Sequence, residues 1–152
     1  DSLGEKNREE TQTKILWNEL VDGNLKWLCS HFNMGSTGAG IVYTTFQYLD
    51  SMYEGLIQEC QTENYVANAS SGQKGLLEVI QKSYQELLDS NELSDPNDQM
   101  YVQRLEEITG LLKEQATHLH TFATEGDQES SDAYLQTKDA VWVRISDLLG
   151  LE

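Results

Sequence analysis

The sequence is poor in cysteine and proline, and it has no long apolar run. Two cysteines are too few for a disulfide framework, and the single proline leaves long stretches free to be helical. We expect Cys29 and Cys60 to be unbridged, because each falls on the apolar face of a predicted helix, where a free cysteine packs as a small hydrophobe. No apolar run reaches the roughly 18 residues that a membrane span needs. The sequence therefore predicts no insertion into a membrane.

Basic side chains are also scarce. Twenty-six Asp and Glu against ten Lys and Arg give a formal net charge of −16. A field of this sign repels phosphate backbones, so it predicts no nucleic-acid binding, and it favours encounter with basic proteins. A simpler interpretation stays open, namely that the charge only keeps a small helical protein soluble. The composition favours a soluble, cytoplasmic protein.

What the sequence has is helical periodicity. The stretch 41–60 shows it most clearly, because apolar residues recur there at alternating steps of four and three. They are Val42, Phe46, Leu49, Tyr53, Leu56 and Cys60. We expect this helix to be the largest single contributor to the core. No part of the chain shows the period-two alternation of a strand.

Similar patterns predict five helices in all. Their approximate ranges are 9–32, 41–61, 72–90, 96–125 and 131–149. Pro96 suits the first turn of the fourth helix, with Ser94 or Asp95 as its cap. The intervening segments 33–40, 91–95 and 126–131 are rich in Gly, Asn, Ser and Asp, which predicts loops. The polar segment 61–73 predicts a loop in its second half, with a short helical turn at Tyr65, Val66 and Ala67 as the alternative for the residues before it. The expected fold is an all-α, up-and-down bundle with a four-helix core and one additional helix, forming a single domain over 1–152 with frayed ends at 1–10 and 150–152.

Motifs for catalysis, metals and cofactors are missing. The glycine-rich segment 35–40 lacks the Lys-Ser/Thr pair of a phosphate-binding loop, and it follows a helix rather than a strand. No Glu-x-x-His and no Gly-x-Ser-x-Gly occurs. Glu114 and His118, one helical turn apart, lack companion residues, and we interpret them as a pair. The sequence thus predicts no enzyme, no bound metal and no cofactor.

The leading interpretation is a non-enzymatic, acidic protein-interaction module that binds or inhibits a basic partner protein, as an immunity protein, an inhibitor or an adaptor does. The predicted surface joins the glycine loop to an exposed tyrosine and an acidic loop. It consists of Gly35, Gly38, Gly40, Tyr43, Glu92, Asp95 and Asp98.

An alternative interpretation is a ligand-sensing helical bundle from a larger receptor or regulator. Asn24 and Gln115 interrupt apolar stripes and could then face a cavity between helices. The simpler explanation is that each lies at a bundle edge or is hydrogen-bonded within the core.

Overall fold

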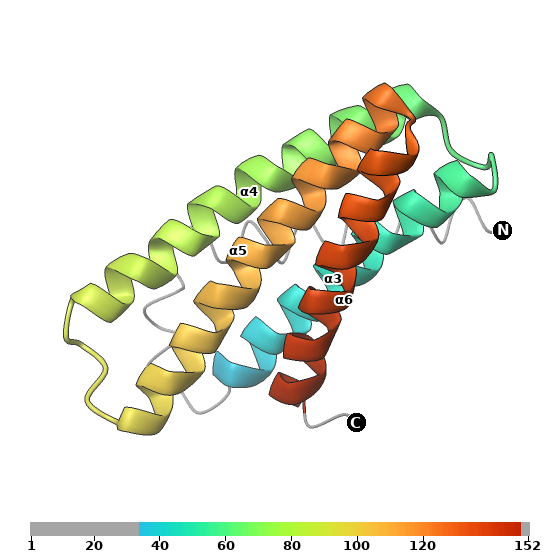
Figure 1. Cartoon of the computed structure of the whole chain (residues 1–152). Coiled ribbons are helices and arrows are strands. Elements are labelled where there is room, and N and C mark those ends of the chain that lie inside the picture. The colour runs from blue at the N-terminus through green and yellow to red at the C-terminus, as the bar shows by residue number, and fades with distance from the viewer. Residues whose placement is uncertain (1–33, 150–152) are drawn as a thin grey trace, which may run out of the picture.

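The computed structural model describes residues 34–149, and this part of the chain is all-helical with no strand (Figure 1). Its elements are α3 (Met34–Ile57), α4 (Glu63–Asp89), α5 (Pro96–Glu125) and α6 (Gln128–Leu149). The all-α prediction is confirmed. The predicted helix over 9–32 and both frayed ends lie outside the described residues, so an additional fifth helix is not supported. None of the described helices is long and apolar enough to cross a membrane.

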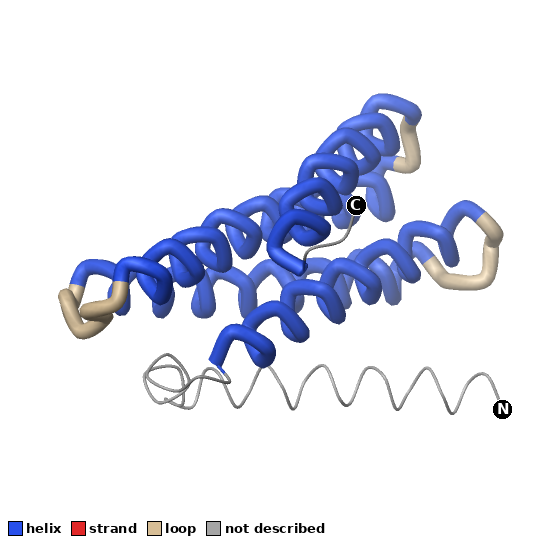
Figure 2. Tube along the Cα trace, turned by 90° about the horizontal axis from the view of Figure 1, so that it is seen from below, coloured by secondary structure: helices blue, strands red, loops and turns tan. Residues whose placement is uncertain are grey.

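Consecutive helices run in opposite directions, so the described bundle is up-and-down (Figure 1). α4, α5 and α6 lie side by side, and α3 crosses behind them, as the view from below also shows (Figure 2). α5 packs more extensively against the other helices than any of them does and is therefore the central element.

The core forms where the apolar faces of the helices pack together. On α5, Leu105, Ile108, Leu112 and Leu119 are buried at steps of three, four and seven residues. On α3, the predicted stripe is buried from Val42 to Tyr53. Its last member, Cys60, is exposed and free rather than packed, because α3 ends at Ile57 and the chain turns away from the core.

Local signals explain the ends of α5. Asp95 caps its start, since the Asp95 carboxylate accepts a hydrogen bond of 2.8 Å from the Asn97 amide. Pro96 occupies the first turn, as predicted. Gly126 ends the helix in the left-handed conformation, with φ 68°, and its amide donates to the Phe122 carbonyl. The last loop is nevertheless shorter than predicted, because α6 already begins at Gln128.

The predicted glycine loop over 33–40 is wrong, because α3 begins at Met34. Gly38 is buried inside this helix, and a Cβ built on it would lie 2.6 Å from the Leu105 Cδ1 of α5. This glycine therefore allows two helices to approach closely rather than forming a turn. Gly40, also helical, is exposed and has no atom near its Cβ position.

The loop predicted for the second half of 61–73 is also wrong, because these residues belong to α4, whereas the alternative helical turn at Tyr65, Val66 and Ala67 is part of that helix. α4 starts at Glu63, after Thr62, whose hydroxyl accepts a hydrogen bond of 3.1 Å from the Tyr65 amide. Val66, Ser70 and Leu77 continue one buried face across the polar segment. The Ser70 hydroxyl is satisfied within the helix by donating to the Val66 carbonyl at 2.6 Å. Packing against α5 thus overrides the weak helix propensity of this segment.

Candidate functional site

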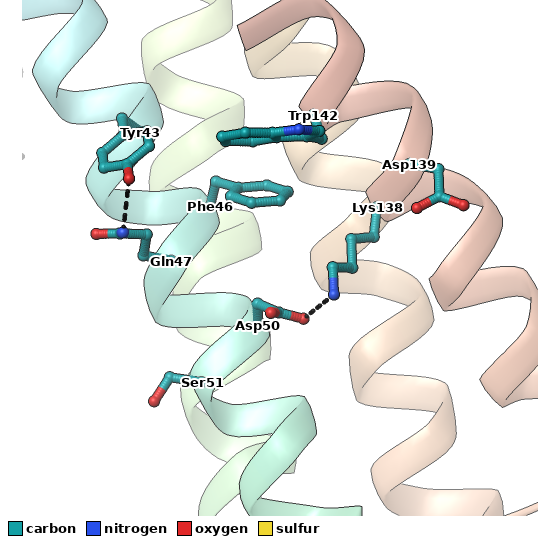
Figure 3. A pocket seen from close by; sticks show the side chains of 8 residues that line it. All are labelled: Tyr43, Phe46, Gln47, Asp50, Ser51, Lys138, Asp139 and Trp142. Carbon is teal, nitrogen blue, oxygen red and sulfur yellow. Dashed lines mark hydrogen bonds and ion pairs between the residues drawn. The ribbon is translucent and has the colours of Figure 1, made fainter. Parts of the chain in front are cut away.

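A groove opens between α3 and α6, and we call it the α3–α6 groove (Figure 3). Its volume is about 520 Å³. It is lined by Tyr43, Phe46, Gln47, Asp50 and Ser51 of α3 and by Lys138, Asp139 and Trp142 of α6.

One wall of the groove is aromatic. Trp142 stacks on Phe46, with ring centroids 5.5 Å apart and planes at 27°, and it lies 6.3 Å from the ring of Tyr43. Phe46 is buried, whereas Trp142 is 39% exposed. The Tyr43 hydroxyl accepts a hydrogen bond of 2.9 Å from the Gln47 side-chain amide, which holds the phenol ring at the groove edge. Phe46 thus supports one face of an indole that solvent still reaches.

The rest of the lining is charged. Lys138 Nζ reaches across the groove to Asp50 Oδ1 at 3.0 Å, and the two side chains are 24% and 25% exposed (Figure 3). Asp139 is exposed at the rim and has no hydrogen bond or ion pair within the described part of the chain. Two carboxylates and one ammonium group therefore line the groove, which leaves it with an excess of negative charge.

A buried polar chain connects this lining to the core. Tyr134, fully buried on α6, donates its hydroxyl to Asp50 Oδ1 at 3.2 Å and accepts a hydrogen bond of 3.1 Å from Gln115 Nε2. Burial, together with the neighbouring Asp50 charge, raises the pKa of Tyr134 well above its usual range. The phenol therefore stays neutral and remains a donor to Asp50.

The position of Gln115 shows whether it faces a cavity between helices or is hydrogen-bonded within the core. Its side chain is fully buried and hydrogen-bonded to Tyr134, and it does not line the α3–α6 groove. The interpretation as a core residue hydrogen-bonded within the bundle is confirmed. Asn24 lies outside the described residues.

A second candidate surface, rich in carboxylates, lies at the end of the bundle where α3 joins α4 and α5 joins α6. The segments 54–63 and 125–132 contain seven exposed carboxylates and no Lys or Arg. We call this surface the acidic end, and its members are Glu54, Glu59, Glu63, Glu125, Asp127, Glu129 and Asp132. The segments are adjacent in space, because Gly126 lines a groove of about 500 Å³ together with Glu59 and Glu63.

Three of these acids stabilise the helix starts at which they lie. Asp127 Oδ1 accepts a hydrogen bond of 3.0 Å from the Ser130 amide at the start of α6, and hydrogen bonds from Ser130 lower the pKa of Asp127. Glu63 and Glu129 lie in the first turns of α4 and α6, where negative charge is favourable. Glu54, Glu59, Glu125 and Asp132 lie outside the first turns.

The residues of the surface predicted from the sequence lie on α3 and at the α4–α5 connection. Gly35 and Gly40 are in the amino-terminal part of α3, Gly38 is buried against α5, and Tyr43 lines the α3–α6 groove. The three acids are exposed at the α4–α5 connection, with Asp98 in the first turn of α5 and Glu92 in the loop. Leu105, which Gly38 faces, is about 15 Å along α5 from Asp95 at 1.5 Å per residue.

The described histidines, His118 and His120, belong to no cluster that could bind a metal. No hydrogen bond or ion pair joins Glu114 to His118 in this part of the chain, so the predicted pair is absent. His120 Nδ1 lies 2.9 Å from the Ala67 carbonyl oxygen, which fixes its ring between α5 and α4. Across residues 34–149, no group of three or more His, Cys, Asp or Glu side chains could hold a metal ion.

No protein-family model, curated protein or solved structure matches this chain.

The sequence pointed to only one residue of the α3–α6 groove, Tyr43. Trp142 and Asp50 were visible only as members of two separate helical patterns, about 90 residues apart in the chain. Knowledge that α3 and α6 are neighbours was required to bring them together, and no local motif carries that information.

Proposed function

We propose that this chain is a non-enzymatic interaction module that binds a basic partner protein, with the acidic end as its principal contact surface. The observation that carries the proposal is the seven exposed carboxylates of this end, with no Lys or Arg in the two segments that form it. Such a one-sided field accelerates encounter with a positively charged surface and disfavours acidic competitors. An inhibitor, an immunity protein or an adaptor would each use it in this way.

Helix stabilisation explains only part of this cluster. Like charges gathered on one surface repel each other and lower stability, so acids without a capping role are costly to keep together. Glu54, Glu59, Glu125 and Asp132 form that costly set. Opposite charges on a partner would relieve the repulsion, which favours a binding role for these four side chains.

Affinity capture from the native source, at low and at high salt, tests the proposal. We expect a basic protein to be retained at low salt and released at high salt. A variant that neutralises the four acids, by Glu→Gln and Asp132→Asn, should lose this protein. A matched control neutralises four exposed acids elsewhere, Glu78, Glu86, Asp89 and Glu114, and it should still retain the protein. Equal losses in both variants would mean that net charge alone matters and that the acidic end is not the contact surface.

The surface predicted from the sequence is tested in the same assay. The variant Glu92→Gln, Asp95→Asn and Asp98→Asn removes its charge, and asparagine at position 95 keeps the ability to cap α5. Loss of the partner from this variant, with the acidic-end variant unaffected, would move the contact surface to the opposite end of the bundle.

The second candidate function is a ligand-sensing bundle, and the α3–α6 groove favours it, since an aromatic wall beside polar groups is typical of small-molecule sites. Native mass spectrometry of the protein purified from its source would show a bound small molecule that is released on unfolding. Retention of such a molecule without any protein partner would favour sensing over the interaction module.

A further inference from the structure

The α3–α6 groove combines an indole that is open to solvent with an excess of carboxylate. Trp142 presents an aromatic surface, and Asp139 stands one turn before it on α6 with no partner among the described residues. An aromatic face beside a carboxylate is the arrangement that attracts an organic cation, through the ring quadrupole and through charge. The groove is therefore suited to a positively charged group.

Two other kinds of occupant fit less well. The one cation of the lining, Lys138, is already paired with Asp50 at 3.0 Å, so an anion would find no free positive charge. A purely apolar side chain would remove water from the Asp50–Lys138 pair and the Asp139 carboxylate without replacing their hydration, which is unfavourable.

The groove is continuous with the acidic end. On α6, Asp132, Leu135, Asp139 and Trp142 follow at steps of three and four residues, and all four are exposed. On α3, Glu54 is one helical turn from Asp50, a rise of about 6 Å. A chain bound at the acidic end can therefore extend along this face into the groove.

We propose that the α3–α6 groove receives an arginine side chain from a basic segment of the partner protein. This inference rests on the proposed function and names the site for one side chain of that partner. The planar guanidinium stacks on Trp142 and donates hydrogen bonds to Asp139. Arginine fits better than lysine, because its flat, weakly hydrated head group combines stacking with several donors.

Lys138 competes with the incoming cation. Its ammonium group occupies Asp50, the second carboxylate of the groove. Replacement of Lys138 by glutamine frees this carboxylate, while Tyr134 still donates to it. The Lys138→Gln variant should therefore bind arginine more tightly than the unmodified protein does.

The test uses the full chain, with hexa-arginine and hexalysine peptides of equal charge as probes. Isothermal titration calorimetry measures the affinity in every variant, and two-dimensional NMR of the tryptophan indole N–H groups locates the site, since the Trp142 signal is the one missing from Trp142→Leu. We expect hexa-arginine to shift this signal and to bind about two- to fivefold more tightly than hexalysine, the ratio that corresponds to an exposed cation–π contact. In Trp142→Leu and Asp139→Asn this preference for arginine should fall towards unity.

Matched controls separate the groove from the general acidity of the protein. Val143→Ala changes an exposed apolar residue beside Trp142 and should keep the preference for arginine. Lys82→Gln makes the same charge change as Lys138→Gln at an exposed site outside the groove, and it should tighten binding less. Trp142→Phe keeps a ring on Phe46, and should give an intermediate preference if Trp142→Leu proves unstable.

The outcomes distinguish the inference from the proposed function. If hexa-arginine binding depends on the four carboxylates of the acidic-end variant but not on Trp142, the interaction module stands and the arginine site is wrong. If neither peptide binds at low salt, both fail. If N-acetylarginine amide alone binds as tightly as hexa-arginine, the groove holds a small guanidinium ligand, and the assignment to a protein segment is overturned.

Discussion

Tyr134 holds the position on which the buried polar chain depends, because its hydroxyl bonds to both Gln115 and Asp50. The Gln115 Oε1 atom already has no hydrogen-bond partner. Substitution Tyr134→Phe would leave both ends of this buried amide unpaired, and we expect it to lower the free energy of unfolding by about 1–3 kcal/mol. Urea denaturation at pH 7 measures the change. An unchanged midpoint would show that Gln115 finds other partners.

Tyr134 should also make the stability of the fold depend on pH. The pKa of Tyr134 in the folded protein is raised above its ordinary value of 10, so the fold favours the neutral phenol. This contribution is complete below pH 10, where the phenol is neutral in both states. Above pH 10 ionisation in the unfolded chain favours unfolding, so stability falls as the pH rises. In Tyr134→Phe, the free energy of unfolding should therefore decline less steeply between pH 9 and 11. Part of the decline should remain, because burial also raises the pKa of Tyr101.

Glu59 is the clearest site of backbone strain among the described residues. It has φ 60° in the turn after α3, a left-handed conformation that costs a residue with a Cβ about 1–2 kcal/mol. Glu59→Gly should raise the free energy of unfolding by roughly 0.5–1 kcal/mol, after the entropy cost of glycine is subtracted. Thermal denaturation tests this, with Glu59→Ala as a control that keeps the strain. Loss of the basic partner in both variants would reflect the missing carboxylate, whereas loss in Glu59→Gly alone would mean that the left-handed backbone conformation serves binding.

At the scale of elements, two helical glycines in α3 give opposite predictions. Gly38→Ala would place a Cβ 2.6 Å from Leu105 Cδ1 in the core, and we expect a loss of about 1–3 kcal/mol through overpacking. Gly40→Ala adds a Cβ to an open, exposed position and should gain up to about 1 kcal/mol through helix propensity. Chemical denaturation of both variants measures the difference. Equal gains would contradict the close contact between α3 and α5.

These glycines also show why the helix boundaries were only partly predictable. The start of α5 depends on Asp95 and Pro96, whose effects are local and can be read from neighbouring residues. Gly38 looks like a loop residue in the sequence, and only the proximity of Leu105 reveals its role in packing. The segment from Asn68 to Gly72 is similar, because contacts with α5 make it helical.

The candidate surfaces were also only partly predictable from the sequence. The acidity of the chain was evident from composition, yet the acidic loop that stood out, at Glu92 to Asp98, is continuous in sequence. The acidic end is assembled from two segments about 70 residues apart, and the α3–α6 groove from two helices about 90 residues apart. Each exists only because the connections between helices fold back to the same place.

At the scale of the whole molecule, the net charge of −16 predicts a marked response to salt. Repulsion among exposed carboxylates destabilises the compact state, and salt screens it over distances of about 10 Å at 0.1 M. We expect the midpoint of thermal unfolding to rise as sodium chloride is increased from 10 mM to 300 mM. The gain should be on the order of 1 kcal/mol, as relief of a few like-charge pairs gives roughly 0.2–0.5 kcal/mol each.

The stability of the four-acid variant at Glu54, Glu59, Glu125 and Asp132 tests whether that repulsion is concentrated at the acidic end. If the acidic end is the main site of strain, this variant is more stable than the unmodified protein at low salt, and it responds less to added salt. The control at Glu78, Glu86, Asp89 and Glu114 removes the same charge away from the acidic end and should gain less, because its acids are spread along α4 and the middle of α5. Equal behaviour of the two variants would mean that the repulsion is spread evenly over the surface. The acidic end would then lack the concentrated field on which recognition of a basic partner depends.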